Sequence, residues 1–365
     1  MGRSHRIRLV AVLIGAMVCG DRAGAADVPG DTAVEPVATG DVLGLPPGDR
    51  PVVVDARFTL RDINEIDDDA ETFEFTGVLA LTWRDPRQSF DRVTAGVDEK
   101  IYQGAYQFNE LSPSWYPQVG LANESGMFQK DGVVLRILPD GTSTLIETVN
   151  AVVEVKFDLR RLPLDAQTLE AVFEVVGFDD GEVRLAADEV REPGAAELPI
   201  PQWELEGTSV FARGRPAPEL GPGRAVSQFV LRIEVRRHAF FLFRLIVLPL
   251  ALIVALSWSV FWMDRSSLGD RMSISFVGIL TAVAYQIVVA DLLPDVSYIT
   301  LLHGFLNVSF FLMAATVPIN LIVGSYDRVG DHLRGDLIDR RCRWIFPVFY
   351  CVSMTLMVIA VHILY

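Results

Sequence analysis

Residues 231–263 read LRIEVRRHAFFLFRLIVLPLALIVALSWSVFWM, and the pattern of the sequence changes within this stretch. Up to Arg236, apolar and charged residues alternate, which is the period of two of a strand with one buried face. From Leu245 to Met263, 19 residues follow without a charge, the length that a helix needs to cross a bilayer. The stretch therefore predicts a β-domain that continues directly into a membrane-spanning helix.

The charge of the chain changes at the same place. Residues 27–235 hold 38 acidic and 18 basic residues, a formal charge of −20, whereas residues 236–365 hold 8 acidic and 10 basic residues. Recognition of phosphates needs a basic surface, so the first region excludes nucleic acid as a partner. A field of this sign instead attracts cations, amines and protons.

Three further uncharged runs follow the first, at 272–290, 296–326 and 344–365. Four such runs leave no polar faces to meet water, which argues against buried helices of a soluble protein. We therefore expect an all-α transmembrane domain at 236–365, with four helices and a short cytoplasmic linker. The expected helices span about 239–263, 270–290, 296–326 and 343–365, and the linker spans 327–342.

The loops between these spans predict the orientation. The loops at 265–271 and 327–343 together carry seven arginines, whereas the loop at 291–297 carries no basic residue. By the positive-inside rule, the first two loops are cytoplasmic, and the acidic domain and the C-terminus lie outside. The N-terminus agrees, because basic residues, an apolar stretch and small residues predict a signal peptide at 1–26. A short membrane anchor and a lipoprotein processed at Cys19 are the alternatives.

The exported region is expected to have a flexible leader at 27–50 and a folded domain at 51–235. Alternating runs such as 149–157, with turn signals such as Pro139-Asp140-Gly141, predict an all-β immunoglobulin-like sandwich. The folded domain contains neither Cys nor His, which excludes a disulfide, a common zinc site and a Ser-His dyad. No glycine-rich phosphate loop occurs either, so we expect neither an enzyme nor a cofactor.

One stripe of the second membrane span is not suited to lipid. Residues spaced alternately four and three apart share one face of a helix, and acidic residues lie at both ends of this face. Around a symmetry axis, the stripe would line a pore with acidic mouths and an apolar constriction at Leu280, Ala284 and Ile287, where Leu280 blocks ions by dewetting. A ring of Asp270 carboxylates predicts cation selectivity. The stripe comprises Asp270, Ser273, Val277, Leu280, Ala284, Ile287 and Asp291.

The segment FDLRRLPLDAQTL at 157–169 resembles the signature loop of the pentameric ligand-gated ion channels, the superfamily of nicotinic, GABA-A and glycine receptors. The resemblance covers nearly all of residues 50–365 and favours the proton-gated bacterial members. Val155 and Leu169 stand where animal members have the two cysteines of the loop disulfide. Other similar stretches are Trp83-Arg84-Asp85, Trp115-Tyr116-Pro117, Pro201-Gln202-Trp203-Glu204, Pro249 and residues 269–273.

The resemblance implies a coupling site where the sandwich meets the helices. It places Pro163 and Asp165 of the signature loop beside Asp68, from the first inter-strand loop, and Arg237, just before the first span. Two carboxylates that flank one guanidinium form a strong cluster. We expect this cluster to transmit motion from the sandwich to the pore.

The resemblance leaves the agonist open. Aromatic residues are missing from the positions of the animal amine cage, and Tyr106 or Phe178 would have to form a pocket instead. The acidic loop that contains Asp67, Asp69 and Glu71 resembles that of the proton-gated channels, so these residues are candidate sensors of protons or Ca²⁺. The metal chemistry of this loop stays unknown. His238 and His303, which lie near the outer membrane face, are the alternative proton switches.

We therefore predict a homopentameric, cation-selective channel surrounded by the lipids of a bacterial inner membrane. Protons or a small molecule would open it from the periplasmic side. Ala282 departs from this pattern, since the proton-gated relatives have a histidine at that position of the pore helix. The alternative is a non-conducting, membrane-tethered sensor or binding protein on the same scaffold.

Overall fold

The computed structural model describes residues 45–48, 51–104, 107–108, 115–187, 191–192, 200–264 and 267–364. The predicted signal peptide and most of the predicted leader lie outside these ranges, as does Tyr106 of the predicted agonist pocket.

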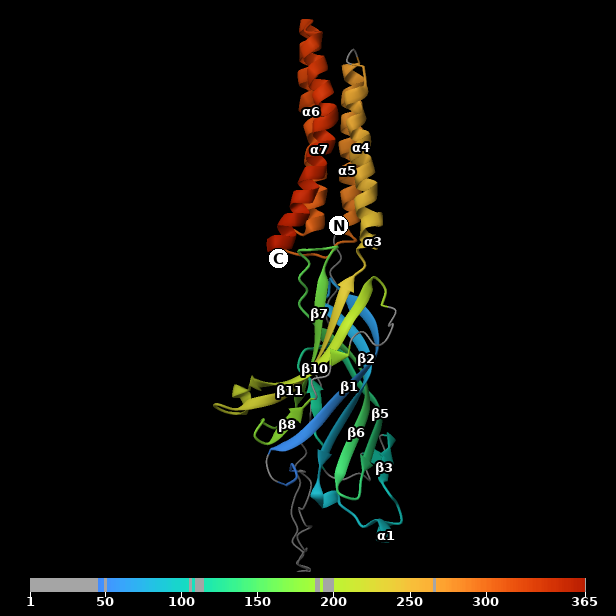
Figure 1. Ribbon diagram of the computed structural model, residues 1–365, viewed down its shortest axis with the longest axis vertical. Helices are drawn as coiled ribbons and strands as arrows, with labels where there is room; N and C mark the ends of the chain where they lie inside the picture. The colour runs from blue at the N-terminus through green and yellow to red at the C-terminus, as the bar shows by residue number, and fades with distance from the viewer. Residues whose placement is uncertain are drawn as a thin grey trace, which may run out of the picture. The chain divides into compact units, whose positions relative to one another are not determined.

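Two sheets form the first domain (Figure 1). One has the strand order β3-β5-β6-β2-β1-β8 and the other the order β4-β7-β11-β10-β9. Neighbouring strands are antiparallel, apart from β1 and β8, which are parallel. The strands are Val52–Asp67 (β1), Thr72–Arg84 (β2), Lys100–Gln103 (β3), Val119–Leu121 (β4), Glu124–Ile137 (β5), Thr142–Glu154 (β6), Ala166–Val175 (β7), Val183–Ala186 (β8), Arg191–Glu192 (β9), Trp203–Pro216 (β10) and Ala225–Arg237 (β11).

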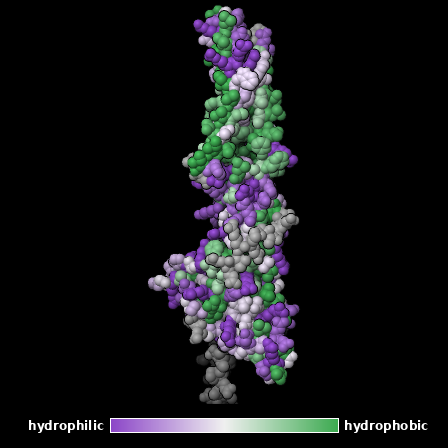
Figure 2. Space-filling model, viewed as in Figure 1, coloured by the Kyte–Doolittle hydropathy of each residue, from purple (hydrophilic) through white to green (hydrophobic). Residues whose placement is uncertain are grey.

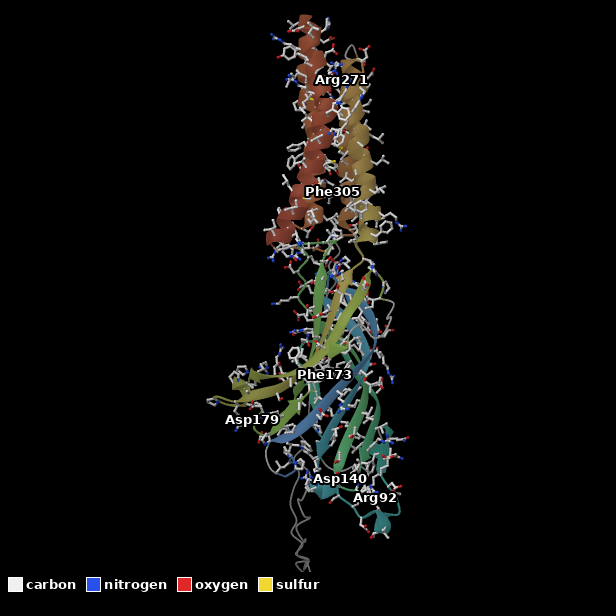
Figure 3. The ribbon with its side chains drawn as sticks, viewed as in Figure 1. Arg92, Asp140, Phe173, Asp179, Arg271 and Phe305 are labelled. Carbon is white, nitrogen blue, oxygen red and sulfur yellow. The ribbon has the colours of Figure 1, made fainter. Side chains whose placement is uncertain are left out.

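Aromatic side chains join the two sheets in the core. Phe58 of β1 packs 5.5 Å from Phe173 of β7, measured between ring centroids, and Phe173 packs 6.0 Å from Phe229 of β11. Phe173, labelled in Figure 3, and Phe229 are both fully buried. Such tilted ring pairs add to the free energy gained by burying their apolar surface. Short helical turns at Pro86–Gln88, Arg92–Ala95 (α1) and Pro218–Leu220 connect strands.

Four helical segments long and apolar enough to cross a membrane follow the sandwich. The first, Ala239–Trp262, comprises α3 (Ala239–Leu242), a π-helical turn (Phe243–Val247), α4 (Leu248–Ser257) and a 3₁₀ turn (Trp258–Trp262). The others are α5 (Leu268–Ala290), α6 (Leu301–Val329) and α7 (His332–Leu364). Figure 2 shows apolar side chains gathered over these helices. The predicted fold class, a β-sandwich followed by four membrane helices, is confirmed.

The bounds of the third and fourth helices differ from the sequence-based expectation. Thr300 caps α6, since its Oγ1 accepts a hydrogen bond from the His303 backbone N–H at 3.2 Å, so α6 begins at Leu301 rather than near 296. Residues 332–342, expected as most of a linker, form the first turns of α7. Their charges end the apolar run, but charged residues do not end a helix. The break between α6 and α7 is made by Gly330, whose φ of 83° only glycine adopts readily.

Pro249 joins the first span to the second. Proline has no N–H, so the carbonyl of Leu245, four residues earlier, has no helical donor. The hydroxyl of Tyr285 on α5 donates to this carbonyl at 2.7 Å and lies 3.2 Å from the carbonyl of Ile246. The site of the missing hydrogen bond, in the π-helical turn before α4, thus becomes a contact with α5.

Candidate functional site

Arg237, the last residue of β11, is the centre of a buried cluster of charges. Its Nε donates to Asp165 Oδ1 at 2.9 Å and its Nη2 to Asp165 Oδ2 at 3.3 Å. The same Nη2 lies 2.8 Å from Asp68 Oδ2. Only 4% of the Arg237 side chain and 1% of the Asp165 side chain are exposed. The structure therefore brings together the three charged residues that the resemblance places at a coupling site.

Trp203, which the sequence analysis does not assign to this cluster, completes it. Trp203 is paired with Arg237 in the register of β10 and β11, and the Arg237 guanidinium lies 4.1 Å from the centroid of the Trp203 ring. Because Trp203 is 5% exposed, this cation–π contact is desolvated and stabilises the buried charge. Its sequence signal is the Pro201–Glu204 stretch, but only the register of the strands shows the contact.

The turn between β1 and β2 positions Asp68. Asp67 Oδ1 accepts hydrogen bonds from the backbone N–H groups of Asp69 and Ala70, both at 2.9 Å, so Asp67 builds the turn. Asp69 and Glu71 are exposed, and Glu71 has the left-handed φ of 53°. Of the acidic residues of this turn, only Asp68 reaches the Arg237 cluster.

The pKa of the Asp68 carboxyl group is raised above its ordinary value. Burial is the main cause, and it outweighs the opposing effect of Arg237; the charges of Asp165 and Asp69 raise the pKa further. Asp68 Oδ1 is buried and has no hydrogen-bond partner among the described residues. Burial thus disfavours the charged form of this carboxyl group.

Hydrogen bonds close the signature loop without a disulfide. Gln167 Nε2 donates to the Asp158 carbonyl at 2.8 Å, and the Asp158 N–H donates to Gln167 Oε1 at 3.2 Å. The same Nε2 donates to Asp165 Oδ2 at 2.8 Å, which orients the carboxylate toward Arg237. Val155 and Leu169, at the positions of the animal cysteines, are buried in the core.

The signature loop contacts the segment between α5 and α6 and the first residue of α6. The backbone N–H of Leu301 donates to the Arg160 carbonyl at 3.0 Å, and the N–H of Leu159 donates to the Tyr298 hydroxyl at 3.0 Å. The Arg160 guanidinium lies 5.2 Å from the centroid of the Tyr298 ring. Pro163, four residues before Gln167 on this loop, is buried. The sequence analysis misses Tyr298, which has no spacing or charge pattern that would single it out.

The predicted pore stripe is exposed along the whole of α5. All seven residues of the stripe are exposed, with Leu280 at 69% and Ile287 at 67%. Ala282 is two residues from Leu280, about 200° around the helix, and is fully buried. The buried residues of α5 are Arg271, Ser275, Ala282 and Val289.

A buried polar network holds the back of α5 to α6. Ser275 Oγ accepts hydrogen bonds from Asn320 Nδ2 at 2.9 Å and Thr316 Oγ1 at 3.1 Å. All three residues are fully buried. Because a buried polar group without a partner is costly, this network selects one rotation of α5 and leaves the stripe uncovered.

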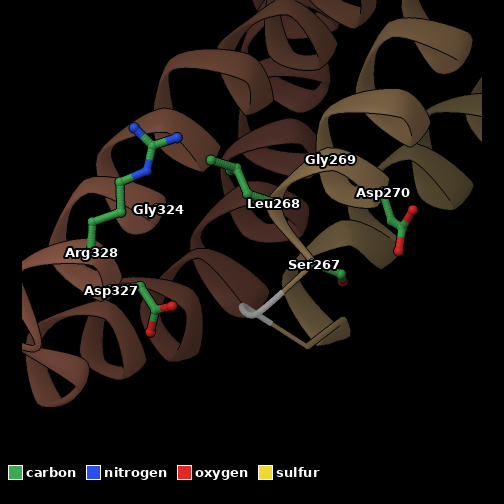
Figure 4. A pocket seen from close by; sticks show the side chains of 7 residues that line it. All are labelled: Ser267, Leu268, Gly269, Asp270, Gly324, Asp327 and Arg328. Atoms are coloured by element: carbon green, nitrogen blue, oxygen red, sulfur yellow. The ribbon is translucent and has the colours of Figure 1, made fainter.

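A cavity of about 400 Å³ lies at the N-terminal end of α5. Figure 4 shows Asp270 on the first turn of α5, and Asp327 and Arg328 on the neighbouring helix α6. Asp270 is exposed and makes no ion pair with another described residue. Its carboxylate is therefore available to ions at this end of the helix.

The predicted agonist pocket is not assembled by the described residues. Tyr106 lies outside them, and Phe178 packs partly buried against the core. The tip of the β10–β11 hairpin is instead held by ion pairs that the sequence analysis misses. Arg224 Nη1 lies 3.2 Å from Asp179 Oδ2, and Arg215 Nη2 lies 2.9 Å from Glu174 Oε1.

The two candidate histidines lie near the sandwich ends of the helices. His238 is exposed just before α3, and His303 Nδ1 lies 2.8 Å from Thr300 Oγ1 beside a cavity of about 350 Å³. Within the described part of the chain, no three His, Cys, Asp or Glu side chains are placed to hold a metal ion. Modulation by Ca²⁺ stays a prediction.

Comparisons with known proteins define the class. The family model of the neurotransmitter-gated ion-channel ligand binding domain matches residues 42–212, and that of the transmembrane region matches residues 246–334. The chain therefore belongs to the pentameric ligand-gated ion channels. The members of this family are ion channels and not enzymes, and the four helices make the chain a multi-pass membrane protein.

The chain is similar to individual ion channels of a bacterium and of animals. The chain is 29% identical over 321 residues to the proton-gated ion channel of Gloeobacter violaceus, covering 87% of this chain and 86% of that protein. It is 26% identical over 272 residues to the gamma-aminobutyric acid receptor subunit rho-2 of Homo sapiens, covering 73% of this chain and 56% of that subunit. It is 25% identical over 279 residues to a gamma-aminobutyric acid receptor subunit beta-like of Drosophila melanogaster. The chain thus spans little more than half the length of these two animal subunits.

Proposed function

We propose that the protein forms a homopentameric, cation-selective channel of the bacterial inner membrane, with its ectodomain and C-terminus in the periplasm. Protons or a small agonist open it from that side. The observation that carries this proposal is the division of α5 into an exposed stripe with acidic ends and a buried face held by Ser275. Five copies of this helix around an axis would enclose a path that is acidic at both mouths and apolar at Leu280.

The proposal is tested by recording currents from oocytes that express the full chain while the external pH is lowered from about 8 to about 4. We expect a cation current that grows as the pH falls, because the relative from Gloeobacter violaceus is named a proton-gated ion channel. Candidate amines are applied in parallel. A chain that reaches the surface but passes no current under any of these conditions would be a sensor rather than a channel.

Replacement of Asp270 by alanine is expected to lower the preference for cations over anions about tenfold. One charge at an aqueous mouth is worth on the order of 1–2 kcal/mol to a passing ion. The measurement is the reversal potential in a sodium chloride gradient. Asp295→Ala is the matched control, since Asp295 is an exposed acid outside the stripe. An unchanged reversal potential in Asp270→Ala would remove Asp270 from the selectivity site.

Replacement of Asp68 by asparagine is expected to raise the pH of half-maximal current by about half a unit. The folded-state pKa of Asp68 is above its ordinary value, so its contribution to stability is present at acidic pH and is lost as the pH rises through the raised pKa. Acid therefore neutralises Asp68 and weakens its ion pair with Arg237, and the amide imitates that neutral form. Current–pH curves are compared with those of Asp69→Asn, whose side chain is exposed. Equal shifts in both variants would contradict a specific role for Asp68.

A further inference from the structure

A basic residue directly follows the proposed selectivity residue. Arg271 comes after Asp270 on the first turn of α5 and carries the opposite charge. If both side chains faced the inner mouth, the two charges would cancel. Successive residues of a helix lie about 100° apart, so the side chains are able to point to different surroundings.

Arg271, labelled in Figure 3, is buried between the helices and binds one carboxylate on α7. Its Nη2 donates to Asp339 Oδ1 at 2.7 Å and its Nη1 to Asp339 Oδ2 at 3.1 Å. The side chains are 1% and 4% exposed. This two-fold contact fixes both the position and the plane of the guanidinium.

Asp339 is the only carboxylate that Arg271 contacts in the part of the chain that the structure describes. Arg271 Nε is buried without a hydrogen-bond partner there. A buried charge is stable only when it is paired, and removal of one partner leaves the other charge uncompensated. Without Asp339, the long Arg271 side chain would therefore be driven toward water, and the preceding residue, Asp270, is exposed at the proposed inner mouth.

The first turns of α7 have other attachments to the helices. Arg343 Nε donates to the Phe261 carbonyl at 2.9 Å, and its guanidinium lies 5.6 Å from the Trp262 ring centroid. Phe346 packs 4.9 Å from Phe261, measured between ring centroids. Loss of the Asp339 charge would therefore release Arg271 without releasing α7.

We propose that Asp339 is a positioning residue for ion selectivity, which keeps the Arg271 guanidinium out of the permeation path. The inference rests on the proposed cation selectivity. In a pentamer, release of Arg271 would add five positive charges at the ring of Asp270 carboxylates. The sign of the charge at the inner mouth is thus set by a residue on the helix α7, which does not carry the pore stripe.

The test compares reversal potentials of the full-length channel and its variants in a sodium chloride gradient, with surface labelling of each. Asp339→Asn is expected to lower the cation-over-anion preference about tenfold. The double variant Arg271→Leu with Asp339→Leu is expected to regain the preference, because no guanidinium remains and apolar pairs replace buried ion pairs well. Asp336→Asn is the matched control, since Asp336 is an exposed acid one turn earlier on α7.

The outcomes separate this inference from the function on which it rests. A wild-type channel that passes anions or no current overturns the proposed function. A cation-selective wild type with an unchanged reversal potential in Asp339→Asn overturns the role of Asp339 alone. A double variant that is as poorly selective as the single variant also overturns it, since a purely structural role would not be rescued by removing Arg271. Loss of surface labelling in both variants would assign the pair to folding and reject the proposal.

Discussion

The Asp165→Ala variant is expected to lose its evoked current almost completely. Asp165 accepts hydrogen bonds from Arg237 Nε, Arg237 Nη2 and Gln167 Nε2, and it is fully buried. Its removal leaves a buried guanidinium with Asp68 and Trp203 alone, which costs about 3–5 kcal/mol. The signature loop then loses its side-chain contacts with the end of β11, and the backbone hydrogen bond from the Arg237 N–H to the Asp165 carbonyl, at 3.1 Å, remains. The measurement is the maximal current, normalised to surface expression.

Asp158→Ala is the matched control for this variant. Asp158 lies on the same loop, but its side chain is 58% exposed and pairs with Arg160 at the surface. A surface pair of this kind contributes about 0–1 kcal/mol, so most of the current should remain. Equal losses of current in the two variants would show that the loop tolerates replacement of neither acidic residue. A specific role of Asp165 in coupling would then be refuted.

The Leu280→Ser variant is expected to open about tenfold more readily than the wild type and to pass current at rest. Leu280 is 69% exposed at the middle of the stripe, where an apolar ring excludes water from a narrow pore. A hydroxyl in each of five subunits would let water remain in the constriction. The closed state would lose about 1.4 kcal/mol for a tenfold change in the equilibrium. Resting current and the midpoint of activation are the measurements.

Val288→Ser separates a gate from a general weakening of α5. Val288 is 63% exposed and apolar, but it lies about 80° around the helix from Leu280. Its replacement should leave the resting current unchanged. A similar gain in both variants would mean that any polar substitution loosens the helix, and Leu280 would not be the gate.

Periodic features of this chain are readable from its sequence, whereas contacts between distant segments are not. The stripe of α5 follows from the spacing of its residues, because a helix converts steps of three and four into one face. Arg271 and Asp339 are 68 positions apart, and no local pattern connects them. Asp339 also fell within the expected linker, because hydropathy registers where a membrane run ends and does not register where a helix begins.

The coupling site is predicted only in part from the sequence, because some of its residues meet through contacts between distant segments. A family resemblance supplies Asp68, Asp165 and Arg237 as a group, since the motif around each is recognisable. Trp203 joins them only through the register of β10 and β11, and Tyr298 only through the way the signature loop meets the segment before α6. Register and loop packing depend on the whole sandwich, so a single sequence does not disclose them.

The hydrogen bonds of Gln167 determine how the signature loop responds to redox conditions. In animal members a disulfide closes the signature loop, and a reductant is able to cleave it. Here the closure consists of an amide side chain and the peptide group of Asp158, and both cysteines of the described chain lie in α7. The loop therefore has no redox couple, and its closure is the same in an oxidising and in a reducing medium.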